Sequence, residues 1–154
     1  RKLNVSIPAG IDTGQAITLR GEGGHGKKGG QNGDLYVYIT VRPHKLFTRR
    51  GSDLYMDIGI SYAQAALGDE VEVPTLEENI KYKIPEGTQP GTIFRIKQKG
   101  IKKLHGLDKG DLYVTVGVEV PRKLNAKQKE LLREFDESVR GVQPHEKKKG
   151  LFGK

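Results

Sequence analysis

The stretch Gly33-Asp34-Leu35-Tyr36-Val37 returns later in the chain as Gly110-Asp111-Leu112-Tyr113-Val114, at an offset of 77 residues. Ile7-Pro8-Ala9-Gly10 returns as Ile84-Pro85-Glu86-Gly87 at the same offset, and the register holds between the two anchors without a gap. Self-similarity at a fixed spacing is the sequence signature of a repeated structural unit. The sequence therefore predicts two copies of one unit.

Most of the chain alternates apolar and polar residues with a period of two, which indicates strands that bury one face. The alternation is clearest over residues 3–7, 35–41, 54–60 and 112–120. Segments rich in glycine and proline separate these runs, and the longest of them, residues 21–33, indicates a long hairpin loop. The pattern predicts a mostly β protein with two tandem, similar, small β-sandwich units.

One long helix is predicted after the second copy. Asn125 suits the N-cap position, Gln128 follows at the spacing of a capping box, and Gly141 ends the helical pattern. The apolar residues of this helix form one stripe, which consists of Leu131, Leu132, Phe135 and Val139. The stripe packs either on a sheet of the same chain or against a second copy of the chain, and the residues alone leave both possibilities open.

Four parts follow from these patterns. Residues 1–46 are predicted to form the first β-unit, residues 47–124 the second, residues 125–141 the helix and residues 142–154 a basic tail. The second copy has a long preamble, about residues 52–79, whose counterpart for the first copy is not in this sequence. The first unit is therefore expected to be incomplete, with a sheet that lacks part of its pairing partners.

Composition narrows the classes of function. The net charge of +8 favours acidic partners such as nucleic acid, anionic lipid or an acidic peptide. Cysteine is absent, which excludes disulfides and thiolate metal sites, and the four histidines have no metal-ligand spacing. No apolar run is long enough to span a bilayer. No set of residues indicates a catalytic site, so the protein is predicted not to be an enzyme and to contain no metal site.

The glycine-rich segment 21–28 is similar to two nucleotide-binding patterns. Both patterns require a helix directly after the loop, because the helix N-terminus holds the phosphate. The next predicted element here is the strand at 35–41, and Lys28 stands where a P-loop needs Ser or Thr. Nucleotide binding is therefore rejected. A basic β-module that binds nucleic acid, suggested by the net charge, remains the alternative function.

The motifs at residues 5–14, 33–37, 42–54 and 84–91, taken in order, resemble the C-terminal region of bacterial DnaJ. The resemblance covers nearly the whole chain. It implies a cytoplasmic co-chaperone fragment that binds unfolded or apolar polypeptide segments, delivers them to a DnaK-type ATP-dependent chaperone, and forms a homodimer. It implies no cofactor in this chain, because zinc is expected only in a cysteine-rich module that this sequence lacks.

The same resemblance implies which residues act. The peptide groove would contain Leu3, Val5, Ile17, Leu19 and Phe47, and the dimer contact would consist of Leu131, Leu132, Phe135 and Val139. Phe47 lies in a predicted loop between Lys45 and Arg49, where an exposed ring beside cations would suit an apolar, mildly acidic peptide. The other interpretation is that all five groove residues pack in a core or in the linker between the copies.

Overall fold

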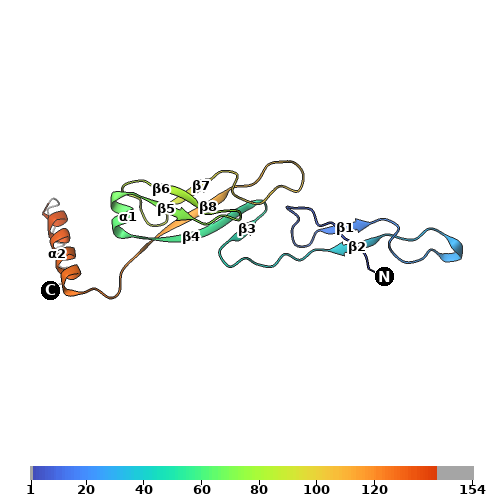
Figure 1. The fold of residues 1–154 in the computed structure, drawn as a ribbon, viewed down its shortest axis with the longest axis horizontal. Coiled ribbons are helices and arrows are strands. Elements are labelled where there is room, and N and C mark those ends of the chain that lie inside the picture. Colours follow the sequence, from blue (N-terminus) through green and yellow to red (C-terminus); the bar gives the residue numbers. More distant parts are fainter. Residues whose placement is uncertain (1, 142–154) are drawn as a thin grey trace, which may run out of the picture. The chain divides into compact units, whose positions relative to one another are not determined.

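The computed structural model describes residues 2–141 of the chain. Residue contacts divide the chain into two compact units, residues 1–119 and 120–154. The elements of the first are β1 (Ala16–Leu19), the 3-10 turn η1 (Lys27–Gly29), β2 (Leu35–Tyr38), β3 (Thr48–Arg50), β4 (Asp53–Ser61), α1 (Tyr62–Leu67), β5 (Asp69–Val73), β6 (Ile80–Ile84), β7 (Ile93–Ile96) and β8 (Leu112–Glu119). The second contains α2 (Ala126–Arg140) (Figure 1).

Apart from residues 120–124, both copies of the repeat fall within the first compact unit, so the boundary predicted between residues 46 and 47 stays a prediction. The predicted basic tail, residues 142–154, lies outside the described residues. Below, the first copy means residues 1–46 and the second copy residues 47–124.

The strands form three sheets. In the first copy, β1 pairs antiparallel with β2. In the second copy, a four-stranded sheet has the order β3-β4-β8-β7, and β5 pairs with β6 in a separate hairpin. Strands β4 and β8 run parallel, from the pair Leu54–Leu112 to the pair Ser61–Glu119. The prediction of a mostly β protein with one C-terminal helix is confirmed.

The core of the second copy lies between its four-stranded sheet and the β5–β6 hairpin. The largest fully buried side chains are Val73, Ile84, Leu112, Val114 and Val116. They come from both layers, and each contributes about 1.5–3 kcal/mol by leaving water. The second copy therefore encloses a core made of its own residues.

The duplication extends to individual hydrogen bonds. In the first copy, the Gly21 amide donates to Asp34 Oδ1 at 3.0 Å, and in the second the Gln98 amide donates to Asp111 Oδ1 at 2.9 Å. Gly21 and Gln98 also share a left-handed backbone, with φ of 71° and 59°. The register repeats too, because Ala16 pairs with Tyr38 as Ile93 pairs with Thr115. These relationships agree with two copies of one unit.

Two strand predictions are corrected by the structure. Residues 3–7 form no strand, because no other strand pairs with them in the part of the chain that the structure describes. The strand predicted over residues 35–41 ends at Tyr38. Its counterpart β8 continues to Glu119 because β4 pairs with it along its second edge.

The predicted C-terminal helix is confirmed with its caps. The Gln128 amide donates to Asn125 Oδ1 at 2.8 Å, and the Asn125 amide donates to Gln128 Oε1 at 2.9 Å. At the other end, the Gly141 amide donates to the Glu137 carbonyl at 2.9 Å. Over residues 2–141, neither this helix nor α1 has the length and apolar character that crossing a membrane requires.

Candidate functional site

The first copy carries a partly exposed apolar face on β1 and β2. Ile17 is paired with Val37, and Leu19 with Leu35. Directly paired residues share one face of a sheet, so these four side chains form one apolar surface. All four are half-buried. The structure thus brings the predicted groove residues Ile17 and Leu19 together, and adds two neighbours that the sequence prediction left out.

The corresponding face of the second copy is covered. Leu112, Val114 and Val116 stand 77 residues after Leu35, Val37 and Ile39, and their exposed fractions are 1% or less. The β5–β6 hairpin provides the cover: Tyr82 of β6 lies 5.1 Å from Phe94 between ring centroids. Phe94 and Ile96 are the counterparts of Ile17 and Leu19. Among the described residues, the first copy has no hairpin that plays this part.

The edge of β2 is also open. Strand β8 pairs with β7 on one side and β4 on the other, whereas its counterpart β2 pairs with β1 alone within residues 2–141. An unpaired strand edge presents a row of backbone donors and acceptors to which an extended peptide can pair. The open edge and the half-buried face belong to the same two strands.

Leu3 and Val5 lie in an irregular segment before β1. Leu3 is exposed and Val5 is half-buried. Because residues 3–7 do not form a strand, the alternation that placed Leu3 and Val5 on one sheet face does not operate there. Their role in a groove stays a prediction.

The sequence predicted an exposed Phe47, but the structure buries this side chain. Its exposed fraction is 6%, and it packs in the core of the second copy with Leu54 and Met56. The reason is the pairing of β3 with β4, which places the residue before Thr48 beside the core. The ring also lies 4.9 Å from the ring of His44. The prediction that the Phe47 ring is exposed is therefore wrong. A direct contact of Phe47 with a peptide stays an untested prediction.

The two copies are joined by Arg49 of β3. Its guanidinium group donates to the carbonyl oxygens of Gly10 at 2.8 Å and Ile11 at 2.9 Å. Its Nε lies 3.4 Å from Asp12 Oδ2, and Ile11 is buried. This junction has no strong signal in the sequence, because it links residues almost 40 positions apart.

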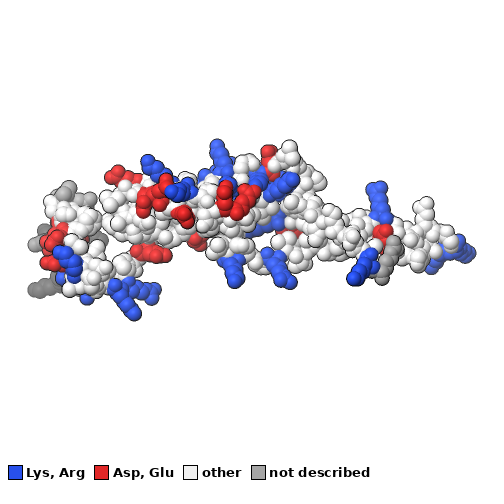
Figure 2. Space-filling model, viewed as in Figure 1, with Lys and Arg blue, Asp and Glu red and all other residues white. Residues whose placement is uncertain are grey.

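Several charged side chains of the second copy form ion pairs, and both signs lie side by side on the face that Figure 2 shows over β5 and β6. The Lys81 ammonium lies 3.3 Å from Glu70, and Lys109 pairs with Glu77. The Lys109 side chain, by hydrogen bond and charge, holds the pKa of Glu77 below its usual value. Such exposed pairs contribute little to stability.

Asp111 is the buried charged group of the same copy. Its carboxylate accepts from the Gln98 amide at 2.9 Å and from Arg95 Nε at 2.6 Å. The backbone hydrogen bond from Gln98 and the hydrogen bond from Arg95 lower the pKa of Asp111, and the same pairing raises the pKa of Arg95.

Helix α2 leaves its apolar stripe exposed. Leu131, Leu132, Phe135 and Val139 have exposed fractions between 46% and 50%. No residue of α2 is buried in the described structure. These exposed fractions do not test whether the stripe packs on a sheet of the same chain, so that alternative stays open. The role of the stripe as a dimer contact stays a prediction.

Over residues 2–141, no cluster of three or more His, Asp or Glu side chains has an arrangement that could hold a metal ion. The prediction that this chain needs no cofactor is not tested by that finding and stays a prediction.

Comparison with known proteins places these features in a family. Residues 1–121 match the model of the DnaJ C terminal domain, and residues 127–154 match the model of the Chaperone protein DnaJ C-terminal region. The chain is 57% identical over its whole length to the Chaperone protein DnaJ of Ruminiclostridium cellulolyticum, 40% of which it covers. Over 99% of its length it is 58% identical to that of Acetivibrio thermocellus and 56% identical to that of Clostridioides difficile, covering 39% of each. The chain therefore belongs to the DnaJ family and corresponds to its C-terminal part.

Proposed function

We propose that this chain is a polypeptide-binding and dimerising part of a cytoplasmic co-chaperone, which holds unfolded or apolar segments for a DnaK-type ATP-dependent chaperone. The chain spans about 40% of the length of the curated relatives that it matches. The observation that carries the proposal is the contrast between the two copies. The apolar face that the second copy covers with β5 and β6 is only half-buried in the first.

The proposed mode of binding follows from the strands that carry this face. An extended segment would pair its backbone with the open edge of β2, which tolerates many sequences because main-chain groups make the hydrogen bonds. Its apolar side chains would contact the surface around Ile17 and Leu19. Each buried methylene contributes about 0.8 kcal/mol, so two or three large side chains support weak, reversible binding.

The exposed stripe of α2 supplies the proposed dimer contact. Pairing of two stripes would remove four apolar side chains of each chain from water. A dimer would carry two polypeptide-binding surfaces, and tethering raises the effective concentration of the second surface once the first is occupied. The weak affinity of one surface would then suffice to hold a long unfolded client.

The test compares apolar surfaces of the same chain. The double variant Ile17→Ser, Leu19→Ser is expected to bind a fluorescent apolar peptide about tenfold more weakly than the parent, because two side-chain contacts are lost. The control is Leu67→Ser, Leu107→Ser, which removes two strongly exposed apolar side chains elsewhere.

Both variants are first checked for unchanged far-ultraviolet circular dichroism, and suppression of aggregation of a denatured client is measured in parallel. Equal binding by the two double variants would contradict the proposed surface. A parent chain that binds no apolar peptide would contradict polypeptide binding by this chain.

A further inference from the structure

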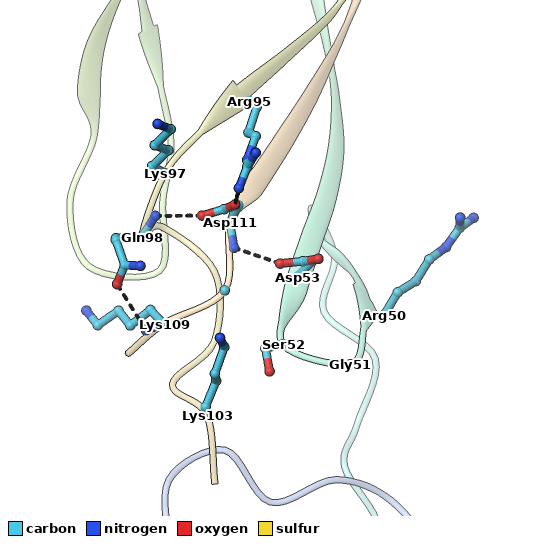
Figure 3. A pocket seen from close by; sticks show the side chains of 11 residues that line it. Arg50, Gly51, Ser52, Asp53, Arg95, Lys97, Gln98, Lys103, Lys109 and Asp111 are labelled. Carbon is cyan, nitrogen blue, oxygen red and sulfur yellow. Dashed lines mark hydrogen bonds and ion pairs between the residues drawn. The ribbon is translucent and has the colours of Figure 1, made fainter. Parts of the chain in front are cut away.

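A cavity of about 580 Å³ lies at one end of the four-stranded sheet of the second copy, between the β3–β4 turn and the loop that joins β7 to β8 (Figure 3). Its lining is dominated by cations, which are Arg50, Arg95, Lys97, Lys103 and Lys109. Only two acidic residues, Asp53 and Asp111, line it. The peptide surface described above belongs to β1 and β2, so this cavity has no part in it.

The cavity is held open by two backbone segments, the β3–β4 turn and the β7–β8 loop, which pack closely against each other. The Ile101 amide donates to the Ser52 carbonyl at 2.8 Å. A Cβ at Gly100 would lie 2.5 Å from that same oxygen, and a Cβ at Gly110 would overlap it. The loop therefore approaches the turn so closely that only glycine fits at both positions. This contact fixes the walls on which the cationic side chains are mounted.

The two acidic residues of the lining, Asp53 and Asp111, already accept hydrogen bonds from other lining residues. Asp111 holds Arg95 through Nε, and its own amide donates to Asp53 Oδ1 at 2.8 Å. Lys109 is paired with Glu77. Lys97 and Lys103, in contrast, form no ion pair with any described residue. Figure 3 shows the Lys103 side chain directed toward the strand ends that carry Asp53 and Asp111.

The charged residues that line the cavity therefore leave it with an excess of positive charge. Cations that share a concavity repel one another, and an anion entering it relieves that repulsion at every one of them. Arg95 is held in place by Asp111 and does not need to be ordered on binding. Lys97 and Lys103 add ammonium groups, which bind phosphoryl oxygens as compact point charges, whereas the planar fork of Arg95, which would match a carboxylate, is already engaged by Asp111.

We propose that this cavity binds a small ligand with clustered phosphoryl groups, and that Lys97 and Lys103 make the main contacts. None of the lining residues is aromatic, so the cavity offers no platform on which a nucleobase would stack. Apolar side chains are likewise absent from the lining, which separates this site from one for apolar peptides. The phosphoryl groups can come from a free oligophosphate or from a lipid headgroup that carries several phosphates.

The experiment titrates the full 154-residue chain with sodium tripolyphosphate by isothermal calorimetry at low ionic strength. The double variant Lys97→Gln, Lys103→Gln is expected to bind about tenfold more weakly, because two charge-assisted contacts are lost. The matched control is Lys27→Gln, Lys28→Gln in the hairpin loop of the first copy, which lowers the net charge by the same amount. It is expected to bind as the parent does.

Further titrations distinguish the two sources of phosphate from each other and test two other classes of ligand. Binding to phosphatidylcholine vesicles that contain phosphatidylinositol bisphosphate, lost in Lys97→Gln, Lys103→Gln only, would assign the phosphates to a headgroup; binding of tripolyphosphate alone would assign them to a free ligand. Equal loss in both double variants, or absence of saturable binding, would overturn the proposal. So would a preference for oligothymidylate or for a poly-glutamate peptide of equal charge.

Discussion

The guanidinium group of Arg49 donates a hydrogen bond to the carbonyl oxygen of Gly10 at 2.8 Å, so that a side chain of β3 holds a turn of the first copy. The same side chain donates to Ile11 and, through Nε, to the Gly51 carbonyl at 2.8 Å. A lysine has one ammonium group and does not reproduce the planar fork that reaches three separate oxygens. Arg49 is therefore the main polar link between the two copies that the structure describes.

Replacing this link is expected to loosen the junction. Arg49→Lys should lower the free energy of unfolding by about 1–3 kcal/mol, since hydrogen bonds from a charged donor are lost. The control is Arg50→Lys, the neighbouring residue, whose guanidinium lies over the ring of Tyr55 in the second copy. Urea unfolding of both variants measures the difference, and an equal loss in the two would show that the junction does not depend on Arg49.

Gly110 and Gly33 occupy equivalent positions of the repeat but have different surroundings. A Cβ at Gly110 would overlap the Ser52 carbonyl, whereas a Cβ at Gly33 would meet only the Gly24 oxygen, at 3.8 Å. Gly110→Ala is expected to destabilise the protein by about 1–3 kcal/mol through overpacking. Gly33→Ala is expected to leave the stability of the protein unchanged. Thermal unfolding followed by circular dichroism checks the pair, and the reverse order would refute the close approach of the two loops.

Phe47 is expected to behave as a core residue. Phe47→Ala should lower the free energy of unfolding by about 3–5 kcal/mol, because it removes a buried ring and leaves a cavity. Its neighbour Leu46 is 56% exposed, so Leu46→Ala should change stability by less than about 0.5 kcal/mol. Chemical denaturation gives both values. A stable Phe47→Ala variant that had lost peptide binding would instead favour the groove role implied by the family resemblance.

Asp111 makes stability depend on acid pH. Its pKa is lowered in the folded state by the Gln98 amide and by Arg95. The stabilisation is therefore fully present above the unfolded value of about 3.9 and is lost as the pH falls through the lower folded pKa. Asp111→Asn should be less stable than the parent at neutral pH, and the gap in melting temperature should close below about pH 4.

The equivalent variant in the first copy is a control for this pH effect. Asp34 is exposed and accepts from Gly21, without a partner equivalent to Arg95. Asp34→Asn should lower the melting temperature less than Asp111→Asn does. A gap for Asp111→Asn that stayed constant from pH 7 to pH 3 would show that its carboxylate does not contribute through its charge.

The stripe on α2 is expected to set the molecular mass in solution. Phe135→Asp should halve the mass measured by sedimentation equilibrium, because a charge in an apolar contact is strongly unfavourable. Arg133→Asp, on the opposite side of the helix, should leave the mass unchanged. A parent chain that sediments as a monomer, or a Phe135→Asp variant that stays dimeric, would count against the proposed contact.

The repeat, the strand-rich character and the C-terminal helix were all predictable from the sequence, because each depends on local signals. The offset of 77 residues located equivalent strands, and Asn125, Gln128 and Gly141 marked the ends of α2. Alternation also predicted a strand at residues 3–7, but a strand forms only where another strand pairs with it.

Tertiary structure decided the features that depend on which distant segments meet. Phe47 is buried because β3 pairs with β4, and Arg49 meets Gly10 across 39 positions of sequence. Equivalent residues such as Val37 and Val114 have the same local pattern and differ in burial because β5 and β6 cover only one of them. Periodicity reports which face of a strand is apolar, and only the arrangement of the whole chain determines whether that face is covered.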